Sequence, residues 1–575
     1  MAARITSSPL RHLAPPLTLG LTWLLCWAFH PQAWSQDIEQ TYGRLRERLK
    51  NDPITIHGGL NGQLQFNSIS GAPARRDPFN YFLSGHLQLD ILGVQAPLSL
   101  AFADGNTTYR LPAYALVGLS PSYKWATLHL FRRNLHFSDY TFSDHGFNGV
   151  GLELKPGRLR VMGMYGQLRK ARLEDYGYRQ ELDPHYTRRG YALRLGYQHQ
   201  QDELYATVFK AADDPASLTL HDSLGIRPQE NVVLGLEGKK HVSKSLTLKA
   251  EYAYSLLSPL HPWPGRAAYK LERLFSPFMP VNATSQSSSA YNFGIDFSPV
   301  KTWALSIQYE RVNPNFISLG TLNYRNDFEN ATVGYRGLLA KKIALQGRMG
   351  IERNNLDQHE LESRRRFLLS AQVNVPVTPH WQNGFAYTNF RQTTRIIANT
   401  DPLNPVDSIF LGSINHQWSY HTSYQLRPAQ RLMLSATLQS ANSILYEQIT
   451  AATSTIKNVA LSYHYAPPKA KLSGQASLLW HNITQSTLTT AVWSPAISVQ
   501  YKPQDKLQCI FLLMNNFVRQ QNTSGSQILR LQFTTQYTLS KQQKILLRLQ
   551  GLRRSGAVSN NFSEGYGTLG YSWSF

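Results

Sequence analysis

Four residues with metal-binding side chains lie within ten positions of one another: His136, Asp139, Asp144 and His145. Imidazole and carboxylate groups are ligands of transition metals, so a metal site is the first chemistry to consider here. Their spacing matches no recognised metal motif, and polar residues of a loop explain the group more simply. The sequence therefore predicts no metal site and no cofactor.

Hydrolysis is the second chemistry to consider. It would need a nucleophile, a base and an orienting group that meet across neighbouring elements of the fold. Serine and histidine are abundant in this chain, so chance pairings carry little weight, and no constellation stands out. We therefore predict that the protein is not an enzyme.

Attraction of anions is the third chemistry, and the charge favours it. The formal net charge is +22, and it falls to +20 if Arg4 and Arg11 leave with an export leader. Most of the excess lies in short connections, which contain fifteen cations against Asp505, a net of +14: Lys155, Arg158, Lys239, Lys240, Lys244, Lys341, Lys342, Arg427, Arg431, Lys469, Lys471, Lys502, Lys506, Lys541 and Lys544. These connections are either solvated turns that touch anionic headgroups or a docking ring for an acidic periplasmic partner.

A smaller set of charges falls on the polar side of alternating segments, where they would line a pore. Eight cations stand against four glutamates, a net of +4: Arg160, Arg194, Lys249, Arg336, Arg348, Arg366, Arg530 and Arg548 against Glu237, Glu251, Glu310 and Glu352. A basic pore prefers anions, but so small a net charge predicts only a mild preference. The alternative interpretation is structural, with the arginines paired to the glutamates within the wall.

The elements that would position these charges are β-strands. The chain ends on "EGYGTLGYSWSF", in which Leu569, Tyr571, Trp573 and Phe575 alternate with small polar residues. This ending resembles the last strand of bacterial outer-membrane β-barrels, and the resemblance implies that Tyr571, Trp573 and Phe575 close the barrel and are read by the barrel-assembly machinery.

The beginning of the chain has the features of an export signal. Arg4 and Arg11 precede an apolar stretch at residues 17–29, and Ala33-Trp34-Ser35 forms a small-x-small cleavage site. We predict that residues 1–35 are a removed signal peptide, with a retained anchor as the alternative. Cys509 is then the only cysteine of the mature chain, which excludes a disulfide framework.

Alternating segments of about ten residues recur between residue 54 and the C-terminus, as in residues 413–426 and 528–539. A lipid-facing exterior and a polar lumen explain both faces, and closure leaves no unpaired edge in lipid. The sequence predicts an all-β, transmembrane antiparallel barrel of about 24 strands (22–26) over residues 54–575, in the outer membrane of a Gram-negative bacterium. Short turns would face the periplasm and long loops the exterior.

Two regions do not follow this pattern. Residues 36–53 show the spacing of a short amphipathic helix and are predicted to lie at the periplasmic mouth. Two termini in the periplasm require an even number of strands, whereas the count is 25. We place the surplus in residues 104–146, which form either an inward-folded constriction or ordinary loops around one strand.

Three stretches resemble outer-membrane barrel proteins of the Bacteroidota type: "RRDPFNYFLSG", "SPSYKWATLHLFRRNLHFSDYT" and "KPGRLRVMGMYGQLRKA". The resemblance covers about a quarter of the chain. It implies the same fold and location, but it provides no catalytic or ligand residues.

The function that the sequence favours is a pore or passive channel for small polar solutes, with a mild preference for anions. A plugged receptor, secretion or scaffold component is the alternative, and an outer-membrane enzyme is the weakest hypothesis. The expected partners are outer-membrane lipid and lipopolysaccharide, the barrel-assembly machinery and an acidic periplasmic protein, with no nucleic acid.

Overall fold

The structure is a computed structural model. It describes residues 54–74, 76–91, 94–103, 115–172, 184–218, 226–260, 275, 277–279, 281, 283–321, 325–397, 408–445, 448–468, 470–486, 488–521, 525–556 and 561–575. The predicted signal peptide, the predicted helix at residues 36–53 and residues 104–114 lie outside this part of the chain.

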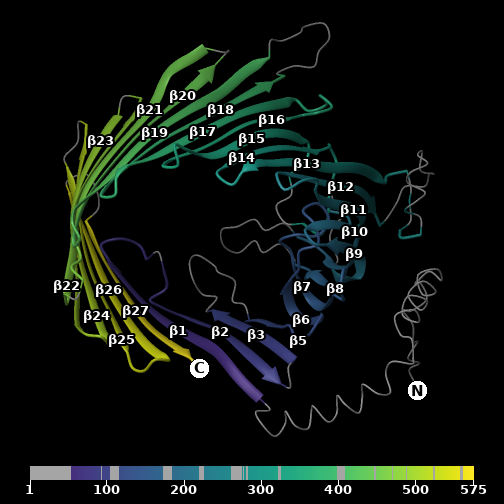
Figure 1. Ribbon diagram of the computed structural model, residues 1–575, viewed down its shortest axis with the longest axis horizontal. Helices are drawn as coiled ribbons and strands as arrows, with labels where there is room; N and C mark the ends of the chain where they lie inside the picture. Colours follow the sequence, from purple (N-terminus) through teal and green to yellow (C-terminus); the bar gives the residue numbers. More distant parts are fainter. Residues whose placement is uncertain are drawn as a thin grey trace.

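The described chain is almost entirely β-strand (Figure 1). The strands are β1 (Ile54–Ser70), β2 (Phe79–Ile91), β3 (Val94–Ala103), β4 (Ala115–Leu119), β5 (Ser122–Tyr123), β6 (Ala126–Asn134), β7 (Gly146–Leu154), β8 (Leu159–Arg169), β9 (Thr187–His199), β10 (Asp202–Asp214), β11 (Gln229–His241), β12 (Leu246–Pro259), β13 (Gln286–Val300), β14 (Trp303–Val312), β15 (Phe328–Leu339), β16 (Ile343–Asn354), β17 (Glu362–Thr378), β18 (Trp381–Ile396), β19 (Ile409–Arg427), β20 (Gln430–Leu445), β21 (Gln448–Tyr465), β22 (Leu472–Gln485), β23 (Leu488–Gln504), β24 (Leu507–Gln520), β25 (Ser526–Thr538), β26 (Gln543–Gly556) and β27 (Phe562–Ser574). One 3-10 helix, η2 (Pro215–Ser217), follows β10. No described helix is long and apolar enough to cross a membrane.

Consecutive strands pair antiparallel around a single closed sheet, which confirms the predicted antiparallel barrel. The short strands β4 and β5 share one position, because both pair with β3 on one side and β6 on the other. The 27 strands therefore fill 26 positions of the wall. The 26 positions lie at the upper end of the predicted range of 22–26, above its centre of about 24. The count of 25 missed one position because β4 and β5 have five and two residues, too few to show alternation.

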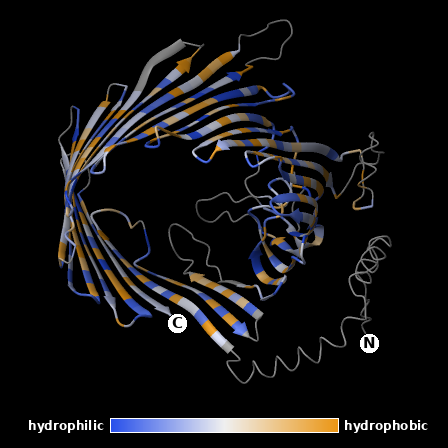
Figure 2. Ribbon diagram, in the orientation of Figure 1, coloured by the Kyte–Doolittle hydropathy of each residue, from blue (hydrophilic) through white to orange (hydrophobic). Residues whose placement is uncertain are grey.

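Alternate residues of each strand point to opposite faces of the wall. On β9, Tyr191, Leu195 and Tyr197 are exposed on the outer face, whereas Ala192 and Arg194 lie on the inner face. Apolar and polar bands alternate along most strands (Figure 2). An apolar exterior around a polar interior is the arrangement of transmembrane β-barrels.

The two ends of the barrel differ in their connections. At the end that carries the C-terminus, at most six residues join successive strands, as at residues 466–471. At the opposite end, the connection between β12 and β13 has 26 residues (260–285). We call these the short-turn end and the long-loop end.

The first and last strands form the seam that closes the barrel. β1 pairs with β27 from Gly59 opposite Ser574 to Ser70 opposite Ser563. Beyond the last paired residue, the Gly58 N–H donates to the Phe575 carbonyl at 2.8 Å, and the Phe575 N–H donates to the Gly58 carbonyl at 3.0 Å. The terminal residue therefore completes the hydrogen-bond ladder of the seam.

The largest buried core lies inside the barrel. Residues 135–145, between β6 and β7, fold against the inner face of the wall; we call them the inner segment. Phe137, Phe142 and the wall residue Phe209 are fully buried there. The connection between β14 and β15 joins the same core through Phe316. The described part of residues 104–146 thus forms strands of the wall and the inner segment. The sequence left two interpretations of this region open.

Candidate functional site

The structure places the predicted wall charges on the inner face of ten strands. The cations lie on β8, β9, β12, β15, β16, β17, β25 and β26, and the acids Glu237, Glu251, Glu310 and Glu352 lie on β11, β12, β14 and β16. Two cross-strand pairs illustrate the register: Glu237 lies opposite Glu251 across β11 and β12, and Glu352 lies opposite Arg366 across β16 and β17.

Three of the cations are neutralised by carboxylates. Arg194 Nη2 lies 2.6 Å from Glu237, and Lys249 Nζ lies 2.7 Å from Asp296. Arg366 lies 3.1 Å from Glu352. The two arginine–glutamate pairs fit the structural interpretation of the wall arginines.

Four other inner-face arginines, Arg336, Arg348, Arg530 and Arg548, form no ion pair with any described residue. Arg336 and Arg348 are exposed, and both line a groove of about 730 Å³ on β13–β18. Hydroxyl and amide side chains such as Gln346 share this groove, together with Asp296, whose carboxylate is paired with Lys249. A groove with free guanidinium groups and neutral hydrogen-bonding groups suits small polar anions.

Two predicted pore-lining acids instead hold the inner segment. The Tyr140 N–H donates to Glu251 Oε1 at 3.3 Å, and the Tyr140 hydroxyl donates to Glu310 Oε1 at 3.0 Å. Arg194, beside Glu237, donates to the Phe137 carbonyl. The sequence indicated the side of the wall on which these groups lie, but it contained no sign of these contacts.

Small residues on the inner face make room for the inner segment. A Cβ atom on Gly235 of β11 would lie 2.7 Å from Thr141 Cγ2. Ala253 and Ala290 are fully buried under the same segment. The wall of β11–β13 is therefore shaped for it.

Asn231 on β11 fixes the neighbouring connection between β14 and β15. Its amide nitrogen donates to Ser255 Oγ at 2.9 Å and to the Ile317 carbonyl at 3.2 Å, and its oxygen accepts from the Leu319 N–H at 3.0 Å. Asn231 is fully buried, so these hydrogen bonds are not exchanged with water. The sequence analysis missed this anchor, since nothing near Asn231 in the chain marks it.

The His and Asp side chains at residues 136–145, which the sequence analysis considered as metal ligands, do not come together at one site. His136 Nε2 lies 3.7 Å from Asp139 on the exposed side, whereas His145 is buried and its Nδ1 donates to the Gly146 carbonyl at 2.9 Å. Burial lowers the pKa of His145, and Arg132 lowers it further. In the part of the chain that the structure describes, no three His, Cys, Asp or Glu residues form a potential metal site.

One arrangement that the sequence analysis missed resembles a catalytic triad. Ser120 Oγ lies 2.8 Å from His129 Nδ1, and His129 Nε2 lies 3.2 Å from Glu153 Oε1. Ser120 is only 4% exposed, and Arg133 donates to its oxygen from both Nε and Nη2. Because a substrate carbonyl has no access to an oxygen engaged in this way, the group fits a structural link between β4, β6 and β7 better than a nucleophile.

The basic turns at the short-turn end are partly neutralised. Lys240 lies 2.5 Å from Asp202, and Lys155 lies 3.0 Å from Glu153. The sequence analysis counted Asp505 alone against these cations, so it overestimated the charge of this rim.

The predicted closing residues lie at the seam. Tyr571 and Trp573 are exposed on the outer face, at 41% and 36%, and the rings of Trp573 and Phe575 lie 4.6 Å apart. They form an aromatic group at the short-turn end, where aromatic residues of barrels meet the membrane interface.

No protein-family model and no curated protein matches the chain. Solved structures match at low identity and low TM-score. A chain of the E. coli P pilus tip assembly intermediate PapC-PapD-PapK-PapG is 10% identical, with a TM-score of 0.45 and coverage of 90% of this chain and 60% of that chain. OccK2 (OpdF) of Pseudomonas aeruginosa in complex with glucuronate is 10% identical, with a TM-score of 0.28 and coverage of 91% and 98%. The ferric enterobactin receptor PfeA is 9% identical, with a TM-score of 0.38 and coverage of 90% and 81%. The chain thus spans about 60% of the length of the matched pilus-assembly chain, and we draw no function from these likenesses.

Proposed function

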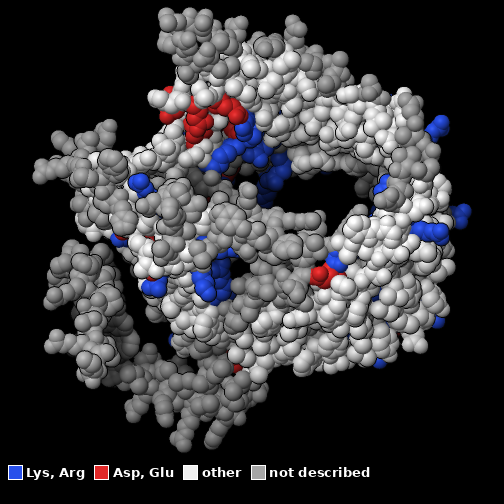
Figure 3. All heavy atoms as spheres, turned by 180° about the vertical axis from the view of Figure 1, so that it is seen from behind, with Lys and Arg blue, Asp and Glu red and all other residues white. Residues whose placement is uncertain are grey.

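We propose that the protein is an outer-membrane β-barrel that forms a pore for small polar solutes, with a mild preference for anions. The observation that carries this proposal is an opening that remains when all heavy atoms are drawn (Figure 3). Lysine and arginine residues gather at its edge. Arg336 and Arg348 lie on the inner face without a carboxylate partner among the described residues. In this proposal the short-turn end faces the periplasm and the long-loop end the exterior.

The alternative is a plugged receptor, secretion or scaffold component. The described inner segment favours the pore, because it packs beside β7–β14, whereas inner-face residues elsewhere, such as Arg348, Gln417 and Arg548, are exposed. We also propose that the protein is not an enzyme, that the assembly machinery reads its last strand, and that the basic rim meets lipid or an acidic periplasmic protein. We propose, from the three stretches quoted above, that the protein is an outer-membrane barrel of the Bacteroidota type.

The selectivity test compares the wall with the rim. We expect the reconstituted protein to conduct ions, with a modest anion preference that weakens as salt rises, because the Debye length shrinks from ~10 Å at 0.1 M to ~3 Å at 1 M. Replacing Arg348, Arg366, Arg530 and Arg548 together by glutamine should move the reversal potential towards cations. Reversal potentials measured in planar bilayers across a salt gradient check this.

The matched control replaces four rim residues, Lys502, Lys506, Lys541 and Lys544, by glutamine, which removes the same charge. We expect a smaller shift from the rim variant, since wide, solvated turns are screened by salt. A larger shift from the rim would place the selectivity there. Absence of conductance in every folded variant would favour the plugged alternative.

Location is tested separately. We expect the mature protein to begin at Gln36 and to fractionate with the outer membrane as a heat-modifiable barrel. N-terminal sequencing and carbonate extraction check this. An intact residue 1–35 segment, or release by carbonate, contradicts it.

A further inference from the structure

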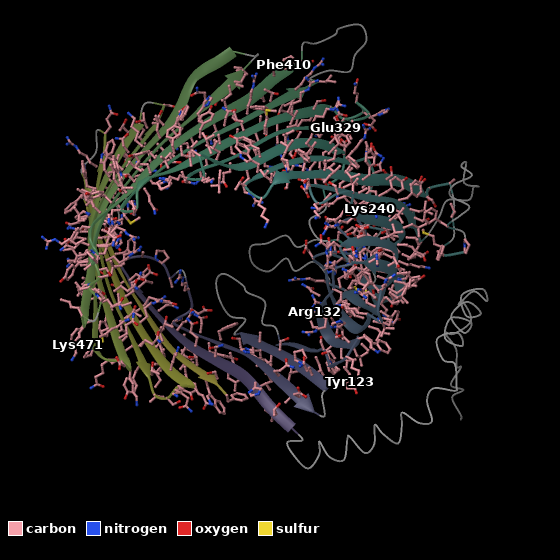
Figure 4. The ribbon with its side chains drawn as sticks, in the orientation of Figure 1. Tyr123, Arg132, Lys240, Glu329, Phe410 and Lys471 are labelled. Atoms are coloured by element: carbon pink, nitrogen blue, oxygen red, sulfur yellow. The ribbon has the colours of Figure 1, made fainter. Side chains whose placement is uncertain are left out.

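A second group of cations lies on the outer face of the wall, near the long-loop end. The group consists of Arg353 on β16, Arg365 on β17, and Arg391 and Arg395 on β18, and we call it the outer arginine cluster. It lines a groove of about 670 Å³ together with Thr393 and Phe410. Glu329 and Phe410, which are labelled in Figure 4, flank it on β15 and β19.

The strand register brings these arginines together. Arg365 lies directly opposite Arg353 on one side, and opposite Thr393 on the other, with Arg391 and Arg395 two residues to either side of Thr393. Like charges at directly opposite positions destabilise a sheet. The same-face neighbours of Arg365 thus include three arginines and no carboxylate.

Among the described residues, Glu329 is the carboxylate that offsets part of this charge. It binds Arg353, and it also accepts hydrogen bonds from Arg311 and from the Tyr309 hydroxyl, each at 3.2 Å. Both oxygens of this carboxylate are therefore engaged by side chains of β14 and β16.

The remaining arginines of the cluster have no acidic partner in the part of the chain that the structure describes. Arg395 donates to Ser408 Oγ at 2.9 Å and lies over the Phe410 ring. Arg365 and Arg391 are exposed, and neither forms a hydrogen bond or ion pair with another described residue. The cluster therefore holds guanidinium donors free for an external anion.

The height of the cluster relates it to the membrane. On β18, ten residues separate the exposed aromatic Trp381 at the short-turn end from Arg391. A rise of ~3.3 Å per residue at a tilt of ~40° gives a height of about 25 Å, the height of the apolar band of an outer-membrane barrel. Immediately below the arginines, Met349 and Ile351 are 45% and 57% exposed on the same face. The cluster thus lies at the boundary between apolar surface and headgroup level.

We propose that the outer arginine cluster binds the phosphate groups of a phosphorylated lipid in the outer leaflet. Guanidinium groups bind phosphate oxygens in pairs of hydrogen bonds, and several arginines around one groove suit a headgroup with more than one negative charge. The acyl chains lie over Met349 and Ile351, while Arg365 and Arg391 contact the phosphates. The proposal rests on the membrane orientation given under Proposed function, but not on conduction by the lumen.

The test measures lipid binding by the full mature chain in phosphatidylcholine nanodiscs. The probes are lipid A with both phosphates, the same lipid A after dephosphorylation, and inorganic phosphate. We expect Arg365→Gln with Arg391→Gln to weaken binding of bis-phosphorylated lipid A by roughly tenfold or more, because two charge-assisted contacts are lost. Dephosphorylated lipid A should bind wild type and variant equally weakly, and millimolar inorganic phosphate should not displace the lipid.

The control variant, Lys457→Gln with Arg553→Gln, removes two outer-face cations of β21 and β26 and should bind like wild type. Equal loss in this control would show a non-specific effect of charge, and unchanged affinity in the Arg365/Arg391 variant would overturn the proposal. Displacement by inorganic phosphate would overturn the lipid as the ligand. Heat-modifiability verifies that each variant is folded. The variant Arg365→Lys with Arg391→Lys keeps the charge and should restore part of the affinity. The conductance of the Arg365→Gln/Arg391→Gln variant is measured as well and should equal that of wild type. A loss of lipid binding with unchanged conductance then concerns the outer arginine cluster and not the pore.

Discussion

Replacing Phe575 by aspartate is expected to reduce the folded protein in the outer membrane by about tenfold or more. The substitution puts a charge on the outer face next to Trp573, at the edge of the apolar band, where charged residues are unfavourable. It also alters the residue whose backbone completes the seam with Gly58. Immunoblots of outer-membrane fractions, with heat-modifiability as the measure of folding, check the result.

Control variants of the last two residues distinguish the contribution of the aromatic side chain from that of the terminal backbone. Phe575→Tyr keeps an aromatic residue and should assemble normally, and Ser574→Asp places the same charge on the inner face, where it should be tolerated. Deleting Phe575 removes both hydrogen bonds to Gly58 and should reduce assembly as well. Normal membrane levels of Phe575→Asp would count strongly against a role of the last residue in assembly.

Replacing Phe142 by alanine is expected to detach the inner segment. Phe142 is fully buried among Phe137, Phe147 and Phe209, with ring centroids 5.7, 6.4 and 5.6 Å away. Loss of such a side chain costs ~3–5 kcal/mol, which corresponds to a hundredfold or greater loss of protection from exchange. Hydrogen exchange of the amides of residues 135–145 should therefore accelerate, and single-channel conductance should rise.

The matched control is Phe293→Ala on β13, because Phe293 is 43% exposed on the outer face and its removal leaves no internal cavity. This variant should exchange like wild type at residues 135–145. If Phe142→Ala keeps wild-type protection there, the core around Phe142 does not hold the inner segment in place.

The sequence was sufficient for the fold class and for the direction in which the charges assigned to the wall point. Both follow from a period of two, because a strand residue must point in or out, and water and lipid accept opposite residue types on the two faces. Arg348 and Arg548 could therefore be placed on the inner face without a structure. The number of strand positions could not be obtained in this way, because β4 and β5 are too short to carry a pattern.

What only the tertiary structure decided is which groups meet. Tyr140 lies more than a hundred residues from both Glu251 and Glu310, and it contacts them because residues 135–145 fold back into the lumen. Arg353, Arg365 and Arg391 come from three strands whose alignment depends on register and on the lengths of the loops between them. Alternation fixes the direction of a side chain locally, whereas its partner is set by pairings between distant segments, and these have no local pattern in the sequence.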